Sequence, residues 1–179
     1  MSIKPVRRMR KTKYITFGAI MAALSVVMLL LGALLNILDL TAVIIASVFL
    51  LIAREEVGYK AIGIYFVTIA IAIIIPMTFV TAIEYAIIAI YPIFKPFFDK
   101  QTVALKWSLK VIYILLASAG IFLVSRFLVA EAPLYMDILL AVGCLLVFFL
   151  YDILLFRFSM YYGFTLRHKL RLDRFFNQY

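Results

Sequence analysis

The chain has 179 residues, of which 67% are hydrophobic and only 15% are charged, and its formal net charge at pH 7 is +9. A soluble domain of this composition would expose too much apolar surface, so the composition predicts an integral membrane protein. The basic residues lie in blocks between apolar runs rather than in one patch, which argues against nucleic-acid binding. A single cysteine, Cys144, excludes an internal disulfide and a cysteine-based metal site, and the single histidine, His168, lies in a basic tail.

The first apolar run, residues 14–35, carries no charge and directly follows a block of cations. As a helix it would be about 33 Å long, which is enough to cross the hydrocarbon core of a bilayer. A secretory signal peptide is the alternative, but the run is longer than a typical h-region and no small-residue cleavage site follows it. Lys and Arg residues that flank a span stay in the cytoplasm, so the N-terminus is predicted to be cytoplasmic. The block consists of Lys4, Arg7, Arg8, Arg10, Lys11 and Lys13.

Two apolar regions are too long for one crossing, and each is predicted to reverse direction once. Residues 14–53 would form a straight helix of about 60 Å, so an outer turn is predicted at 36–39, before a second span at 40–53. Residues 61–94 would reach about 51 Å. Proline breaks helices, so Pro76 predicts an outer turn between a third and a fourth span. One helix kinked at Pro76 is the alternative.

The rest of the chain predicts a cytoplasmic loop and two more spans. The loop covers 95–110 and is partly helical, and the fifth span follows at 107–128. After an outer turn at 129–133, the sixth span runs over 134–160, and Gly163 is predicted to end it in a left-handed cap. The tail, residues 161–179, mixes cations with leucine and phenylalanine, which suits a helix that lies on anionic lipid.

The sequence therefore predicts one all-α domain of the cell membrane, with six transmembrane helices and both termini in the cytoplasm. The charged block at 54–57 marks the cytoplasmic end of the second span. In this topology all of the 18 Lys and Arg residues except Arg126 lie on the cytoplasmic side. A five-span chain would place one basic terminus outside and break this asymmetry.

A candidate ligand site lies in the outer half of the predicted bundle. Glu84 is about 10 Å below the outer boundary if the fourth span begins near residue 77, and a charge at such depth costs about 2.5–3.5 kcal/mol. Glu84 therefore contacts a ligand, pairs with Arg126, or is protonated or hydrogen-bonded within the bundle. Asn36 and Asp39 at the outer turn and Tyr85 beside Glu84 complete the predicted substrate-binding residues.

Other polar and aromatic residues are assigned structural roles. Asp152 lies about 27 Å along the sixth span, near the cytoplasmic boundary. Arg157 does not share its helix face, so Asp152 is predicted to meet a basic residue of another segment. The aromatic residues Tyr65, Phe127 and Tyr135 could line a pocket, but are interpreted as core or interface residues.

The first span also carries two overlapping small-residue pairs, Gly18 with Ala22 and Ala19 with Ala23. Small residues four positions apart let another helix approach closely in lipid. They predict either packing within the bundle or docking of a partner helix.

These features together resemble the substrate-binding S component of energy-coupling factor (ECF) transporters: a basic N-terminus, an alanine-rich first span with Ala19 and Ala23, a short outer loop at 36–39, a second span followed by Gly58 and Gly63, and six spans in 179 residues. The resemblance implies a membrane-embedded binder of a vitamin or other micronutrient. It also implies that the alanine face docks onto a T component driven by two cytoplasmic ATPases. The chain departs from many members because no proline- and glycine-rich loop follows its second span.

Motifs for chemistry are missing from the sequence. There is no GxxxxGK[ST] loop, so ATP hydrolysis would come from a partner, and no HExxH, GxSxG or paired-carboxylate motif. We therefore expect no enzyme activity, no cofactor and no bound metal. The alternative function is a rod-shape-determining type of membrane scaffold for cell-wall synthesis, which would lack a polar pocket in its outer half.

Overall fold

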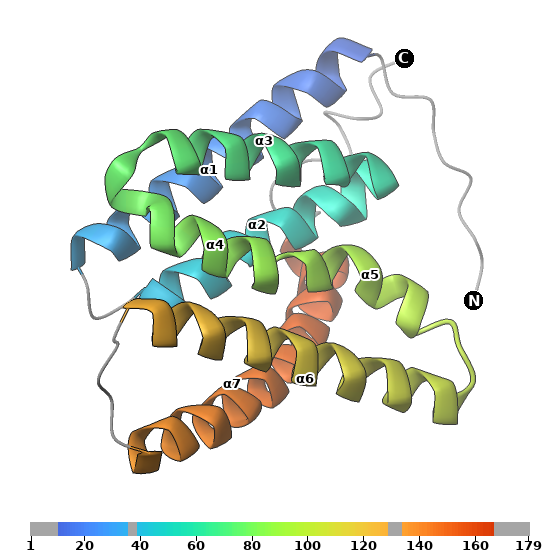
Figure 1. Ribbon diagram of the computed structural model, residues 1–179. Coiled ribbons are helices and arrows are strands. Elements are labelled where there is room, and N and C mark those ends of the chain that lie inside the picture. Colours follow the sequence, from blue (N-terminus) through green and yellow to red (C-terminus); the bar gives the residue numbers. More distant parts are fainter. Residues whose placement is uncertain (1–10, 36–38, 129–133, 167–179) are drawn as a thin grey trace.

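The computed structural model describes residues 11–35, 39–128 and 134–166, and within these it contains helices and no strand (Figure 1). This confirms the predicted all-α fold. Short 3-10 turns cover Gly58–Lys60 and Pro76–Thr78, and a π-helical turn covers Tyr162–Leu166. The α-helices are α1 (Lys11–Leu35), α2 (Asp39–Val57), α3 (Ala61–Ile74), α4 (Phe79–Ile88), α5 (Ile90–Phe98), α6 (Val103–Leu128) and α7 (Leu134–Tyr161).

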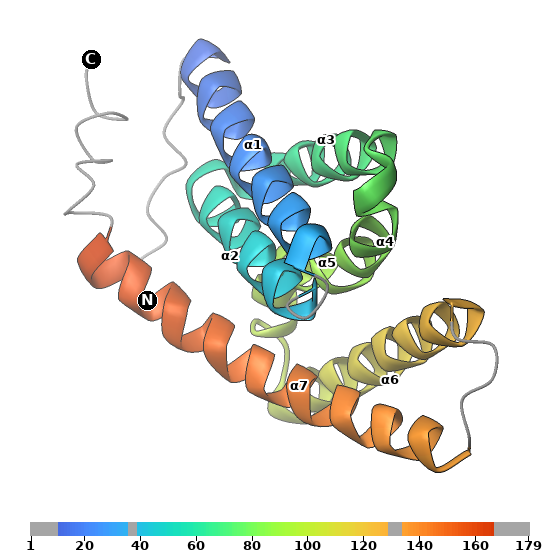
Figure 2. The same ribbon diagram turned by 90° about the vertical axis from the view of Figure 1, so that its left-hand side faces the viewer.

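Five helical segments of the described chain are long and apolar enough to cross a membrane, by length and composition. One of them contains a chain reversal, because α2 and α3 run in opposite directions (Figure 1). The α4–α5 pair, α6 and α7 continue this alternation. Figure 2 shows α1–α4 gathered on one side and the α6–α7 hairpin on the other, with α5 between them. The five segments are 12–35, 39–74, 76–98, 103–124 and 142–165.

The alternation gives the bundle two chemically different ends. One end, called the basic end, holds Lys13, Arg54, Lys60 and Lys106. The other end of the bundle, called the opposite end, holds Asp39 and Pro76. The described cations at the start of α1 and around the end of α2 therefore lie at one end.

The reversal after α2 depends on Gly58. Its φ of 72° lies in the left-handed region, which glycine adopts at little cost and which commonly ends a helix. Gly58 is the only glycine with a positive φ in the described chain, so the predicted left-handed cap at Gly163 is wrong. Gly163 lies within the π-helical turn, and the helical path continues through it to Leu166.

The turn at Pro76 is confirmed. Ile75 has an extended backbone, with φ −86° and ψ 111°, and Pro76 begins the 3-10 turn that leads into α4. The buried hydroxyl of Thr78 lies within hydrogen-bond distance of the carbonyl oxygens of Ala72 and Ile75. The carbonyl of Ala72 lacks its helical donor, because Pro76 has no N–H. Since α3 and α4 run in opposite directions, the alternative of one helix kinked at Pro76 is wrong.

The predicted cytoplasmic loop over 95–110 is mostly wrong. Helix α5 continues to Phe98 and α6 begins at Val103, so only residues 99–102 connect them. Two of the four lysines that suggested a solvated loop are instead buried on helices, with Lys95 4% and Lys110 5% exposed. Both are paired with carboxylates, which is the condition for burying charge.

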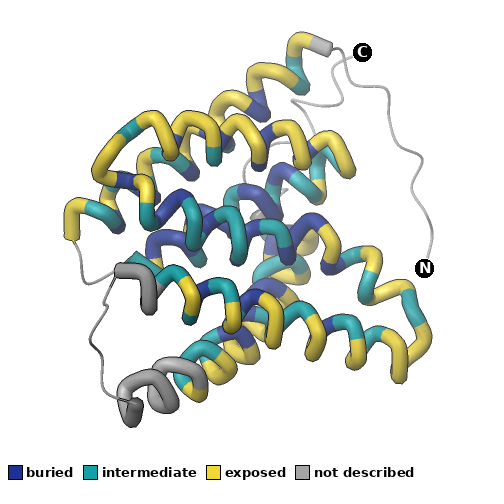
Figure 3. Tube along the Cα trace, in the orientation of Figure 1, coloured by how far each residue is buried: buried dark blue, intermediate teal, exposed yellow. Residues whose placement is uncertain are grey.

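Helix α2 forms the centre of the bundle. It contacts α1, α3, α4, α5 and α7, and most of its buried side chains are small or medium in size. Figure 3 shows the buried positions along the facing sides of the helices, while exposed positions cover the outer faces. Many exposed residues are large and apolar, as the faces of helices in lipid are. The buried residues of α2 are Ala42, Val43, Ala46, Ser47, Leu50, Leu51 and Ala53.

Helices α1 and α2 approach each other closely at Gly32. A Cβ atom added to Gly32 would lie 2.6 Å from the Cβ atom of Ala42 and 3.5 Å from the Cα atom of Asp39. No side chain fits there without moving a backbone, so Gly32 sets the distance between the two helices near the opposite end.

We therefore expect Gly32→Ala to lower the free energy of unfolding by about 1–3 kcal/mol, the usual cost of overpacking. Gly63→Ala is the matched control, since nothing lies within 4 Å of a Cβ atom there. The control should leave stability unchanged or raise it by about 0.5–1 kcal/mol. Thermal unfolding of both variants in the same mild detergent measures this, and equal stabilities would contradict the close approach.

Candidate functional site

Two carboxylates from different helices are neighbours at the opposite end. Asp39 is the first residue of α2, Glu84 lies on α4, and the charge of Asp39 acts on Glu84. Asp39 Oδ1 and Glu84 Oε2 are buried and have no hydrogen-bond partner among the described residues. A buried polar atom without a partner costs about 1–3 kcal/mol, so this pair is the strongest candidate for contact with a ligand.

A small apolar cavity adjoins the pair. Its volume is about 10 Å³, room for roughly one water molecule. Neither Asp39 nor Glu84 lines the cavity, but Leu40, which follows Asp39 directly, and Ile88, four residues after Glu84, both do. A ligand of vitamin size needs about 300 Å³ or more, so binding here requires α2 and α4 to separate from the α6–α7 hairpin. The lining residues are Leu40, Ile44, Ile88, Ile121, Cys144, Val147, Phe148 and Tyr151.

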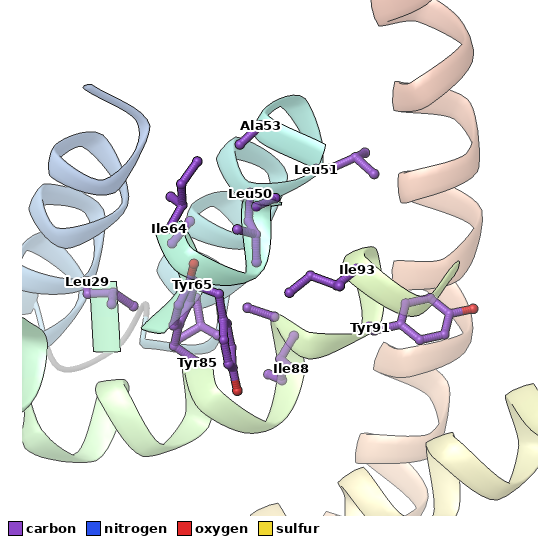
Figure 4. Close-up of a cluster of buried hydrophobic side chains, with 14 of the residues drawn as sticks. Leu29, Leu50, Leu51, Ala53, Ile64, Tyr65, Tyr85, Ile88, Tyr91 and Ile93 are labelled. Carbon is purple, nitrogen blue, oxygen red and sulfur yellow. The ribbon is translucent and has the colours of Figure 1, made fainter. Parts of the chain in front are cut away.

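The side chain of Tyr85 lies in the hydrophobic core and does not line the cavity. Its side chain is fully buried, and its ring centroid is 6.1 Å from that of Tyr65 (Figure 4). Its hydroxyl lies close to the side chains of Ser25 and Thr68, but makes no hydrogen bond of standard geometry. The interpretation of Tyr65 as a core residue is confirmed.

Two predicted site residues cannot be placed beside Glu84. Asn36 lies outside the described residues, and the backbone of Arg126 belongs to α6 but its side chain lies outside the described part. The pairing of Glu84 with Arg126 therefore stays a prediction. The side chains of Phe127 and Tyr135 also lie outside the described part.

The two small-residue pairs of α1 lie on different faces. Gly18 and Ala22 are buried, and a Cβ atom on Gly18 would lie 3.2 Å from the side chain of Ile64 in α3. Ala19 and Ala23 are exposed. The first pair therefore packs within the bundle, and the second pair is left for a partner or for lipid.

The basic end holds a cluster of charges around Asp152, which lies on α7. Lys110 of α6 donates to Asp152 Oδ2 at 2.6 Å, and the ammonium group of Lys95 of α5 forms an ion pair with Oδ1. The hydroxyl of Tyr91 also donates to Oδ1, at 2.6 Å, and Figure 4 shows its ring extending from α5 toward α7. The prediction that Asp152 meets a basic residue of another segment is confirmed.

The sequence did not identify the basic partners of Asp152. Lys95 and Lys110 lie 57 and 42 residues before Asp152, in a segment that was expected to be a loop. The available signal was the pair Tyr91 and Lys95, which share one helix face at a spacing of four. Further contacts tie α7 to the end of α2 at the same end of the bundle. Ser159 donates to Glu55 and Tyr162 donates to Glu56, each at 2.9 Å.

Both polar sites, the Asp152 cluster and the Asp39–Glu84 pair, can bind charged or hydrogen-bonding groups. The Asp152 cluster neutralises buried cations, whereas the Asp39–Glu84 pair presents unpartnered acceptors to a cationic or hydrogen-bond-donating group. In the described chain, no three His, Cys, Asp or Glu side chains are arranged to hold a metal ion. Comparison with protein-family models, curated proteins and solved structures finds no match to the chain.

We expect Asp152→Asn to lower the free energy of unfolding by about 3–5 kcal/mol, because it leaves Lys95 and Lys110 buried beside a neutral group. The matched control is Asp99→Asn, which weakens a 2.8 Å pair with Lys106, in which both side chains are about one-third exposed, and a longer 3.8 Å contact with Lys110. The control should cost at most about 1 kcal/mol. Thermal unfolding in detergent compares the two variants, and equal losses would show that the buried cluster does not stabilise the bundle.

Proposed function

We propose that the protein is the membrane-embedded substrate-binding subunit of an ECF-type transporter for a vitamin or other small micronutrient. The observation that carries this proposal is the carboxylate pair Asp39 and Glu84, near an apolar cavity: one oxygen of each is buried and has no hydrogen-bond partner among the described residues. Charge at such a depth is tolerated where it contacts a ligand, a cavity or a partner. In this proposal, the carboxylate pair contacts a ligand.

The proposed topology has six spans in the cell membrane, with both termini in the cytoplasm. The basic end is cytoplasmic, because Lys and Arg near spans stay on that side. The carboxylate pair then faces outward, where a nutrient arrives. The basic tail, residues 161–179, would bind anionic lipid of the inner leaflet; its residues 167–179 lie outside the described part of the chain.

Coupling to ATP hydrolysis requires partners in this proposal. The partners are a transmembrane T component and two cytoplasmic ATPases, as the resemblance implies. The exposed pair Ala19 and Ala23 on α1 is the docking face, because small residues permit the close helix approach that drives association in lipid. The buried pair Gly18 and Ala22 supports this face from within by fixing α1 against the bundle.

The alternative function is a rod-shape-determining type of scaffold. The small size of the cavity, about 10 Å³, favours it, because a scaffold needs no ligand pocket. The unpartnered carboxylates favour the transporter subunit, since a scaffold gains nothing from leaving buried acceptors unsatisfied. The two functions also differ in the partners that they require.

The topology predicts how single cysteines react in a Cys144→Ala background. A cysteine replacing Met77, 62% exposed at the opposite end, should react with a membrane-impermeant thiol reagent in whole cells. A cysteine replacing Lys100, in the connection between α5 and α6, should react only after the cells are opened. Labelling of position 100 in intact cells, or protection of position 77, would contradict the proposed orientation.

Glu84→Gln tests the ligand site. If the carboxylate contacts the ligand, the variant should insert normally but weaken ligand binding by about 10- to 150-fold, which corresponds to a charge-assisted contact of about 1.5–3 kcal/mol. If Arg126 is the partner instead, the loss should appear chiefly as reduced thermal stability, and Arg126→Gln should produce the same loss.

Uptake and thermal stability are measured together on Glu84→Gln, Arg126→Gln and the double variant. Glu55→Gln at the basic end is the control for loss of an acidic residue, because Glu55 is exposed and the amide oxygen of glutamine can still accept the hydrogen bond from Ser159. Wild-type uptake by Glu84→Gln would remove Glu84 from the ligand site.

A further inference from the structure

Helices α4 and α5 form one pass that bends at Ala89 (Figure 1). The cause is Pro92, which has no N–H to donate to the carbonyl of Ile88 and whose ring displaces that carbonyl. The helical bond from Ala89 N to Tyr85 O, at 2.8 Å, is still present on the α4 side of the bend. Pro92 therefore leaves the carbonyl of Ile88 without its helical donor in the middle of an apolar segment.

Tyrosine hydroxyls from two neighbouring helices donate hydrogen bonds to backbone carbonyls next to the bend. Tyr113 of α6 lies 2.5 Å from the carbonyl oxygen of Ile87 and 3.4 Å from that of Ile88. Tyr65 of α3 donates to the carbonyl of Ala86 at 2.7 Å. Because lipid cannot supply such bonds, the bundle holds the bend with its own side chains. The Tyr113 hydroxyl has two acceptors in reach, so it can exchange one for the other as the bend opens or closes.

The bend lies between the two polar sites of the protein. On one side, α4 carries Glu84 of the carboxylate pair. On the other side, α5 carries Tyr91 and Lys95, which hold Asp152. The ring centroid of Tyr91 is 4.9 Å from that of Tyr113, so the side chain that holds the bend also packs against the cluster.

We propose that the bend at Ala89 is a hinge that couples the Asp152 cluster to the Glu84 end of α4. When the cluster loosens, α5 moves relative to α7, Tyr113 changes its carbonyl acceptor, and α4 shifts beside the cavity that Ile88 lines. A packed interface of this kind moves between discrete arrangements rather than deforming continuously. The inference rests on the bend and the cluster, and it holds whatever ligand or partner the protein has.

The test places a trifluoromethyl label on a single cysteine in detergent-solubilised full-length protein with Cys144→Ala. One label replaces Phe79, 50% exposed at the start of α4, and a second protein carries the label in place of Phe97, 47% exposed on α5. Fluorine NMR then reports each end of the bent pass separately. Asp152→Asn should change the chemical shift or add a second resonance at both positions.

Lys106→Gln is the matched control, because it removes a cation from the same end without touching Tyr91, Lys95 or Asp152. It should leave the signal at position 79 unchanged. Pro92→Ala restores the missing N–H, and in that background Asp152→Asn should no longer change the signal at position 79. Tyr91→Phe, which removes a single hydrogen bond to Asp152, serves as the milder variant if Asp152→Asn does not fold.

The proposal is overturned if loosening the cluster leaves the signal at position 79 unchanged, whether or not position 97 responds. It is also overturned if position 79 responds equally with Pro92 and with alanine there, since the motion would then bypass the bend.

Discussion

The carboxylate of Asp152 accepts hydrogen bonds from Tyr91, Lys95 and Lys110, and the placement of α5 and α6 against α7 depends on it. Lipid cannot solvate charge, so each buried cation must find its counter-charge inside the protein. One residue on α7 meets this requirement for cations on two other helices. The end of α2 joins the same assembly through the bonds of Glu55 and Glu56 to α7, so the basic end is tied by directional contacts across the bundle.

The opposite end is built differently. There, Gly32 lets α1 and α2 pack without an intervening side chain, and the cavity wall is apolar. Within the described part, the buried oxygens of Asp39 and Glu84 have no partner. The polar groups of the basic end are thus paired within the protein, whereas the opposite end has carboxylate oxygens that can accept hydrogen bonds from a ligand or partner. This division is what the proposed ligand-binding subunit requires, with a basic end that keeps its shape and an opposite end that admits the ligand.

Sequence reasoning predicted the features that depend on local chemistry. Pro76 predicts a turn because proline cannot continue a helix, and the uncharged run at 14–35 predicts a long apolar helix. It failed where tertiary pairing overrides local character. Lys95 and Lys110 suggested a solvated loop, but a distant carboxylate lets them lie buried on helices.

The candidate site was predictable only in part. Glu84 stood out as a lone carboxylate in an apolar run, and its neighbour Asp39 was expected at the same end of the bundle. Tyr85 was assigned to the site by adjacency in the chain, yet neighbouring residues of a helix point about 100° apart. Tyr85 therefore faces the core that Tyr65 shares. The role of Tyr113 was not found, because only the folded bundle brings it to the bend that Pro92 causes.

The proposed transporter subunit is tested most directly by affinity purification of the full chain from its native membrane in mild detergent, followed by identification of the copurifying proteins. The account predicts two ATPases and one transmembrane T-type subunit. It also predicts their loss when Ala19 and Ala23 are both replaced by leucine, while Ala70→Leu, at another exposed position, retains them. Recovery of cell-wall synthases without ATPases would contradict the account and favour the scaffold.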